Sequence, residues 1–420
     1  MLADTFTLPA SKIVVSNRIA KASMSEAMAD LRGRPTEALE RLYRAWSAGG
    51  AGLLLTGNVQ VDARYLERVG NVIVEDDAAL AELSSWARAA REHGAHVFMQ
   101  VSHPGRQVQR VVSGSPVAPS AVPAVKLLGT FARPRALEPA EIEDIVARFA
   151  LVARVAERAG FSGVQIHGAH GYLVSQFLSP LTNRRTDAWG GSLEGRAKFL
   201  LDVVARVRAA VSPGFGVAVK LNSADFQRGG FEEGDALKVL AMLEGRGVDF
   251  VEISGGNYEA PALVGEGVAE RTRAREAYFL DFAARARAAT SLPIMLTGGF
   301  RSRAVMEEAL TSGAVDLVGV ARPLAFDPNL PKKLLAGEVD RATAPPVRAR
   351  VRAFQPLAEV AWFAAQMQRI AAGLEPSATL SAEVAMARML GSDFARSFAR
   401  LVARLGRRGP AAALPAPGAT

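Results

Sequence analysis

Two histidines and a tyrosine stand close together in the middle of the chain: His167, His170 and Tyr172. They follow a short apolar segment, 163–166, whose pattern is typical of a buried strand. In a barrel of parallel strands the loop after a strand faces the catalytic mouth, so we expect the three side chains to surround one small volume. Three hydrogen-bond donors placed in this way can hold a carbonyl oxygen and deliver a proton beside it.

The same three residues have two other interpretations. A His-x-x-His pair can ligate a metal, but the chain has no cysteine and no acidic third ligand at a suitable spacing, so we expect no metal. The loop can also be a polar cap on a strand, without any chemistry.

A lysine lies inside a second apolar segment. Lys220 stands in GVAVKLN (216–222), beside Val217 and Val219. A buried ammonium group is costly unless it meets an anion, so this position predicts an electron-rich partner at the end of the strand. The alternative is a lysine that extends along the strand end and keeps its ammonium in water.

Two glycine-containing loops follow later strands. TGGF (297–300) contains Gly298 and Gly299, and VARP (320–323) contains Ala321 and Arg322. In TIM barrels the loops after the seventh and eighth strands commonly bind a phosphate through backbone N–H groups and a short helix. Glycines allow close backbone approach and an arginine can add a bidentate contact. The alternative is that these glycines only make turns.

Strand-like and helix-like segments alternate eight times over about 300 residues, which predicts a TIM (β/α)8 barrel. A doubly wound sheet would also alternate, but no GxGxxG follows the first strand. The strands are expected over 19–24, 52–58, 95–103, 163–166, 216–222, 249–254, 293–299 and 316–322, and the helices over 36–49, 77–93, 139–159, 194–211, 234–246, 274–289 and 302–312. Between them, residues 104–138 are expected to form a lid over the mouth.

The C-terminal part differs from the barrel in charge. We expect the barrel over 1–340, a helix packed on it over 341–380, and a basic amphipathic helix with a disordered tail over 381–420. The net charge is +8, and residues 341–420 alone hold eleven arginines against four acidic residues. The basic pI therefore describes the extension rather than the barrel.

The composition excludes several classes of protein. The chain has 420 residues, 49% of them hydrophobic, which suffices for a large core. It has no apolar run of roughly 18 residues, as a membrane span requires, and no secretory signal pattern, so we expect a cytoplasmic protein without an integral membrane segment. The absence of cysteine excludes disulfides, thiolate nucleophiles and cysteine-ligated clusters.

Two long motifs, IHGAHGYL (166–173) and SPLTNRRTDAWGGSLEGR (179–196), resemble the signature of the Old Yellow Enzyme family. These are FMN-dependent ene-reductases and their NAD(P)H:flavin oxidoreductase relatives. The resemblance implies FMN as cofactor, with its phosphate at the two glycine-containing loops and Lys220 beside flavin N1 and O2. Ser25 takes the position from which a threonine or cysteine bonds the flavin C4 oxygen, and Gln100 matches a glutamine that pairs with the pyrimidine edge. The cofactor-binding residues implied are Ala22, Ser23, Met24, Ser25, Gly57, Gln100, Lys220, Gly298, Gly299, Ala321 and Arg322.

The resemblance also implies a reaction. His167 and His170 would bind the carbonyl oxygen of a small electron-poor alkene such as an enone, flavin N5 would give hydride to its β-carbon, and Tyr172 would protonate the α-carbon. NADH or NADPH would reduce the flavin first in the same site, which gives ping-pong kinetics. Other acceptors are alternatives: the protein could be an NAD(P)H oxidase, a nitro-compound reductase or a demethylase-like oxidase.

Partners other than a small-molecule substrate are open. Flavin-dependent tRNA dihydrouridine synthases share the barrel but rely on a cysteine, so we expect no specific nucleic acid. The helix over 381–405 could bind an acidic partner or an anionic membrane surface. The favoured alternative is that its apolar face docks on the barrel or across a homo-oligomer interface.

Overall fold

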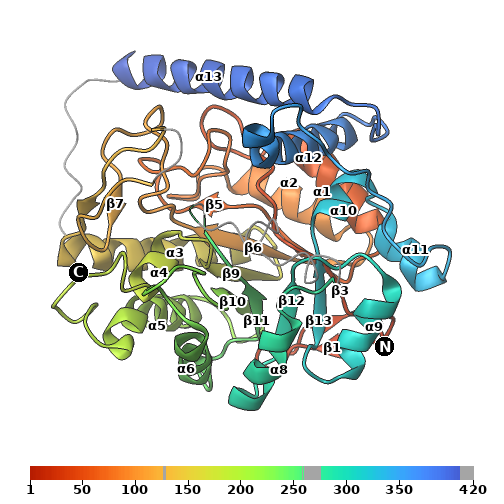
Figure 1. Ribbon diagram of the computed structural model, residues 1–420, viewed down its shortest axis with the longest axis horizontal. Helices are drawn as coiled ribbons and strands as arrows, with labels where there is room; N and C mark the ends of the chain where they lie inside the picture. Colours follow the sequence, from red (N-terminus) through yellow and green to blue (C-terminus); the bar gives the residue numbers. More distant parts are fainter. Residues whose placement is uncertain (126–128, 258, 260–275, 407–420) are drawn as a thin grey trace.

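The computed structural model describes residues 1–125, 129–257, 259 and 276–406. Eight parallel strands close into a barrel, because each strand pairs with the next and the last, β13, pairs with the first, β3. This confirms the predicted TIM barrel (Figure 1). The barrel strands are β3 (Ile19–Lys21), β4 (Leu53–Leu55), β6 (His96–Ser102), β9 (Gly163–Gly168), β10 (Gly216–Asn222), β11 (Phe250–Ser254), β12 (Ile294–Thr297) and β13 (Leu317–Val320).

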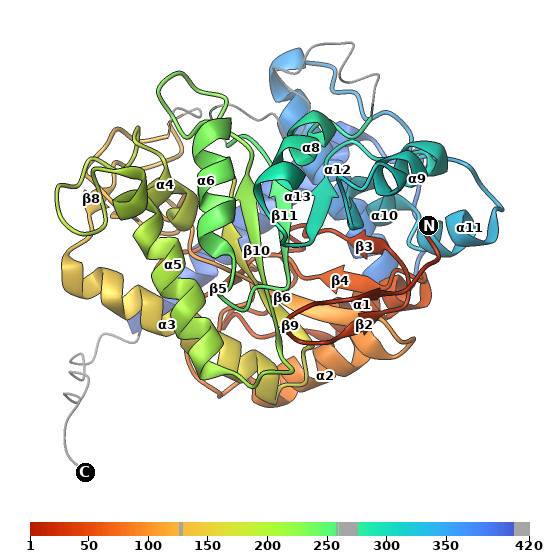
Figure 2. The same cartoon turned by 90° about the horizontal axis from the view of Figure 1, so that it is seen from below.

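Helices surround the strands, as Figure 2 shows from below. Local sequence fixes their ends: α3 begins with Pro139 behind a capping box of Glu138 and Glu141, and Ser192 caps α5 by accepting from Gly195 N–H. Part of the predicted helix 274–289 lies outside the described residues. The outer helices are α1 (Glu37–Ala48), α2 (Leu80–Arg91), α3 (Pro139–Arg158), α5 (Leu193–Ala210), α6 (Glu233–Leu243), α8 (Leu280–Ala289) and α9 (Arg303–Thr311).

A short hairpin that the sequence did not predict closes the floor of the barrel. Its strands are β1 (Phe6–Thr7) and β2 (Val14–Val15), and its Leu8 and Val15 pack among the inward-facing apolar side chains. The buried carboxylate of Asp249 holds it there, since it accepts from Ser11 N–H (2.8 Å) and from Val217 N–H of β10 (2.9 Å). Asp249 thereby ties the hairpin to β10.

The interior of the barrel changes from apolar to polar along the strands. Near the hairpin it is filled by Leu53, Phe98, Phe250, Met295 and Leu317. Because side chains alternate between the two faces of a strand, the residue two positions further along points inward again. On β6 and β11 that residue is polar, Gln100 after Phe98 and Glu252 after Phe250. A polar layer therefore lies on the apolar one, at the end of the barrel where TIM-barrel active sites form.

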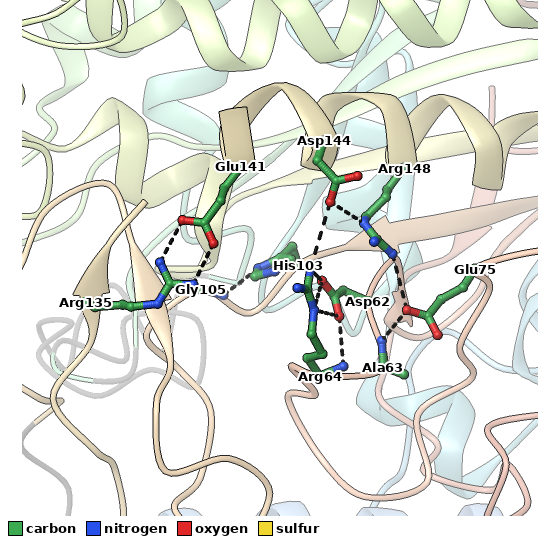
Figure 3. Close-up of polar contacts among 10 residues, drawn as sticks. All are labelled: Asp62, Ala63, Arg64, Glu75, His103, Gly105, Arg135, Glu141, Asp144 and Arg148. Carbon is green, nitrogen blue, oxygen red and sulfur yellow. Dashed lines mark hydrogen bonds and ion pairs between the residues drawn. The ribbon is translucent and has the colours of Figure 1, made fainter. Parts of the chain in front are cut away.

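The segment 104–138 contains two short strands, β7 (Val117–Ala118) and β8 (Arg135–Ala136), which pair with each other. Arg135 holds the end of the segment to α3 by a bidentate ion pair with Glu141 (2.6 and 2.7 Å; Figure 3). Residues 126–128 of the predicted lid lie outside the described residues.

The C-terminal extension consists of two helices, α12 (Gln355–Ala371) and α13 (Ala382–Gly406), which lie beside each other on one side of the molecule (Figure 1). Trp362 of α12 stacks on Phe326. The shorter helices α10 (Arg322–Phe326) and α11 (Leu330–Ala336) lead from the barrel to this extension. None of the described helices is long and apolar enough to cross a membrane. The predicted disordered tail, from residue 407, lies outside the described residues.

Along its middle, the apolar face of α13 does not dock on the barrel, which was one of the two contacts expected for it; the other, a homo-oligomer interface, stays a prediction. Phe394 and Phe398 are 71% and 61% exposed. The polar side of the helix meets the barrel loops instead: Arg396 donates to the carbonyl oxygens of Ala27 (3.3 Å) and Ala29 (3.1 Å).

Candidate active site

A chain of hydrogen bonds crosses the polar layer of the barrel. Ser23 Oγ donates to Gln100 Oε1 (2.7 Å), and Gln100 Nε2 donates to Gln165 Oε1 (2.7 Å). Gln165 Nε2 donates to Glu252 Oε2 (2.7 Å), and Lys220 Nζ donates to Glu252 Oε1 (2.8 Å). The chain thus joins three residues predicted for the site, Ser23, Gln100 and Lys220, through two that were not.

The sequence predicted an anion beside Lys220, and one such anion is the carboxylate of Glu252 in the protein itself. Lys220 and Glu252 face each other in register on β10 and β11, and their side chains are 3% and 0% exposed. Sequence reasoning missed Glu252 although the same signal was present, a charged residue inside the apolar strand DFVEIS. It missed Gln165 too, which precedes His167 by two positions and therefore lies on the same face of β9.

The histidines and the tyrosine lie together, as predicted. The ring centroid of His167 is 5.1 Å from that of His170 and 4.8 Å from that of Tyr172, in both cases edge to face. His167 is the penultimate residue of β9, and Tyr172 directly precedes the short helix α4 (Leu173–Leu178). His170 has a positive φ of 60° and its Nε2 lies 2.8 Å from Ser254 Oγ. That backbone conformation turns the ring of His170 toward β11.

Both imidazoles are held neutral. Burial lowers the pKa of His167 and His170 well below 6.5, and the nearby Lys220 ammonium lowers it further. His167 Nδ1 accepts from Ala169 N–H (3.2 Å), so its remaining proton is on Nε2. Neutral imidazoles of this kind donate a hydrogen bond without adding a positive charge to the site.

The loop after β3 carries Ala22, Ser23, Met24 and Ser25. A buried network pins both of its ends to the end of β4: Lys21 Nζ donates to Leu55 O (2.7 Å), and Glu26 Oε1 accepts from Gly57 N–H (3.0 Å).

Tyr43 of α1 completes this network, because its hydroxyl donates to the Glu26 carboxylate. Burial lowers the pKa of Lys21 to about 8, against the charge of Glu26, which raises it. Burial and the Glu26 charge raise the pKa of Tyr43. The N–H of Gly57, which was predicted to meet the cofactor, is bound by Glu26 in this structure. Ser25 Oγ, also predicted, donates to Glu67 (3.2 Å).

The two glycine-containing loops end the neighbouring strands β12 and β13. Gly298 and Gly299 have φ of 142° and 83°, and a Cβ on Gly299 would lie 2.6 Å from the ring of Tyr278. Ala321 and Arg322 lie where β13 leads into α10. The Arg322 guanidinium is half-exposed and pairs with Glu359 of α12 (3.0 Å). The loops are adjacent as predicted, and the arginine that was expected to clamp a phosphate has a carboxylate partner in this structure.

Comparisons with known proteins agree with the fold. Residues 9–340 match the model of the NADH:flavin oxidoreductase / NADH oxidase family. The chain is 42% identical over 352 residues to the NADH-dependent flavin oxidoreductase iliE of Hypocrea jecorina (strain QM6a), covering 77% of this chain and 86% of that protein. It is 31% identical over 321 residues to the NADPH dehydrogenase of Geobacillus sp. (strain WCH70), covering 76% and 89%.

Solved structures give the same result. The Old Yellow Enzyme homologue from Zymomonas mobilis superposes with a TM-score of 0.68 at 26% identity, covering 81% of this chain and 93% of that one. Morphinone reductase in complex with tetrahydroNAD gives 0.69 at 25% identity, covering 82% and 93%.

Proposed function

Because the chain belongs to the NADH:flavin oxidoreductase / NADH oxidase family, we propose that it passes hydride from NADH or NADPH, through FMN, to an electron-poor alkene such as an enone. The observation that carries the choice of acceptor is the group of His167, His170 and Tyr172 at the mouth of the barrel, with both imidazoles neutral. This group suits a carbonyl compound that gains negative charge on oxygen and then a proton on carbon.

The described residues fit FMN. Lys220 places a buried positive charge in the polar layer, and Gln100 and Ser23 offer amide and hydroxyl groups in that layer. Gly298, Gly299 and Ala321 would hold the phosphate at the ends of β12 and β13. Arg322 would have to leave Glu359 to reach it. When bound, FMN supplies hydride transfer, which no side chain of the chain can perform.

His167 and His170 would bind the carbonyl oxygen of the substrate. Their hydrogen bonds draw electrons from a conjugated double bond and strengthen as negative charge builds on the oxygen, so they stabilise the transition state more than the substrate. Removing one such donor typically costs a factor of about 10² to 10³ in rate. The rigid contacts of His170, to Ser254 through its ring and to Asn222 through its N–H, support this preorganised role.

Tyr172 would deliver the proton to the α-carbon of the substrate. Its ring is 4% exposed and packs edge to face on His167, so the hydroxyl is held in a site from which water is largely excluded. A positioned acid of this kind contributes about 10² to 10⁴ in rate.

Two arginines of the basic helix α13 have partners in the loops of the barrel. Arg396 donates to two carbonyl oxygens of the barrel, and Arg400 donates to Ala63 O (3.5 Å). We propose that α13 serves the barrel itself by holding the loop over 27–29. Its exposed apolar side would be the contact in a homo-oligomer, which the size of the purified protein in solution would test.

The test is a visible absorption spectrum of the purified protein under anaerobic conditions. We expect a flavin spectrum that bleaches with NADH or NADPH and returns on addition of cyclohexenone. The double variant His167→Ala with His170→Ala should retain FMN and lose binding of phenols, which resemble an enolate. The variant His93→Ala, which removes an exposed histidine in the turn after α2, is the matched control.

Each failure has a distinct meaning. Bleaching without recovery would keep the flavin oxidoreductase and discard enones in favour of oxygen, nitro compounds or other acceptors. A protein that neither contains nor binds FMN would contradict the proposed function as a whole.

A further inference from the structure

We propose that Glu252 is a positioning residue that fixes which end of the Gln100 amide faces the flavin, acting through Gln165. This inference rests on the proposed function, since it assigns the polarity of one contact to FMN. None of these three side chains is more than 1% exposed.

The argument starts from the chemistry of the carboxylate. An ionised carboxylate only accepts hydrogen bonds, and the ammonium of Lys220, which only donates, lies 2.8 Å from Glu252 Oε1. The Gln165 amide must therefore turn its NH2 group toward Glu252 Oε2, because its oxygen there would face a negative charge. Its own oxygen is then left for the next residue.

The same constraint passes to Gln100. Gln165 Oε1 can only accept, so Gln100 must donate to it from Nε2. This leaves Gln100 Oε1 as an acceptor for a group outside this pair of amides. The Ser23 hydroxyl, which can donate or accept, donates to this oxygen (2.7 Å). The direction of all three amide and hydroxyl groups thus follows from one charge.

The packing of the barrel keeps the constraint strict. Residue 218, which faces Gln165 in register on the intervening strand β10, is an alanine, so the Glu252 side chain can reach over β10 to β9. Gln100, Gln165 and Glu252 are buried, so no solvent water competes for the hydrogen bonds that join them, and reversing one amide would place two oxygens against each other. A buried conflict of this kind costs more than the hydrogen bond it replaces.

An acceptor held in this way suits one feature of flavin. The pyrimidine edge of the ring carries a single N–H donor, N3–H, between two carbonyl oxygens. A fixed Gln100 oxygen favours the protonated N3, whereas a freely turning amide could donate to the ionised N3. The pH at which bound FMN loses the N3 proton therefore measures the polarity of Gln100.

The experiment reconstitutes the protein with FMN and follows N3 ionisation by absorbance as the pH is raised. In Gln165→Met, the Lys220–Glu252 pair is intact but the link to Gln100 is broken. We expect the ionisation constant of N3 to rise about fivefold, a fall of about 0.7 pH unit in the midpoint, from the value of one hydrogen bond. Gln366→Met is the matched control, because Gln366 is equally buried but binds Ser377 in the C-terminal extension.

A second variant guards against loss of folding. Glu252→Gln keeps the shape of the side chain and removes the charge that sets the direction, so the midpoint should fall at least as far as in Gln165→Met. An unchanged midpoint in the variants that bind FMN would overturn the role of Glu252. Failure of the wild-type protein to bind FMN would instead contradict the proposed function.

Discussion

Acid should destabilise this protein through a buried histidine that takes no part in the proposed reaction. His103 follows β6 and is 1% exposed. Its Nδ1 accepts from Gly105 N–H (3.0 Å), and its Nε2 has no partner among the described residues. Figure 3 shows it behind the ion pair of Asp62 and Arg64.

Burial lowers the pKa of His103 from 6.5 to about 4, although the Asp62 carboxylate opposes this and the Arg64 and Arg148 guanidiniums add to it. Above pH 6.5 the imidazole is neutral in both folded and unfolded protein. Between pH 6.5 and about 4 only the unfolded protein takes up the proton, so the free energy of unfolding falls as the pH falls. The full effect is about 3 kcal/mol, of which about 2 kcal/mol is lost by pH 5.

The assay is urea unfolding followed by tryptophan fluorescence at pH 7.5 and pH 5.0. His103→Gln keeps an acceptor for Gly105 N–H and cannot be protonated, so its loss of stability between the two pH values should be smaller than that of the wild type by about 2 kcal/mol. Between pH 7.5 and 8.5 the two proteins should change equally, which is the internal control. An equal loss in both proteins between pH 7.5 and 5.0 would refute the reasoning.

Three further predictions concern the site and the extension. Tyr172→Phe should slow flavin reoxidation by cyclohexenone by about 10² to 10⁴, while NADPH still bleaches the flavin at the wild-type rate in stopped flow; equal loss of both steps would remove Tyr172 as the proton donor. Glu26→Gln leaves the buried Lys21 ammonium without its carboxylate and should lower the urea unfolding free energy by about 3–5 kcal/mol, whereas the exposed-pair control Glu37→Gln should change it by less than about 1 kcal/mol. Arg396→Ala should speed amide exchange in 27–29 and in α13 without affecting the barrel strands; unchanged exchange there would show that these hydrogen bonds do not hold the loop.

Much of the barrel could be predicted because each strand and each helix has a recognisable local sequence pattern. Buried parallel strands read as apolar runs and the covering helices as amphipathic segments, and both signals survive without any knowledge of contacts. The hairpin at the floor gave no such signal, since strands of two residues are too short to show a period. Its position depends on Asp249, which lies more than 200 residues away.

The candidate site was predictable where a single residue conflicts with its surroundings. Lys220 in an apolar strand predicted an anion, and the clustered His167 and His170 predicted a polar mouth. That Glu252 is this anion could not be predicted, because it depends on which strands are neighbours and on their register. Only the closed barrel determines both. The inward direction of the Arg396 side of α13 was unpredictable for a related reason, because a helix with one basic and one apolar face can turn either toward a protein.

The hairpin that closes the barrel floor has a consequence for synthesis. Ser11 binds Asp249 across 238 residues of chain, so the ribosome must add that length before the two can meet. At typical elongation rates this takes roughly 12–48 s. During this time Leu8 and Val15 have no barrel floor to cover, and a nascent chain that stalls before β11 would expose them to chaperones and to other nascent chains. The hairpin is therefore made long before the residue that fixes it in place.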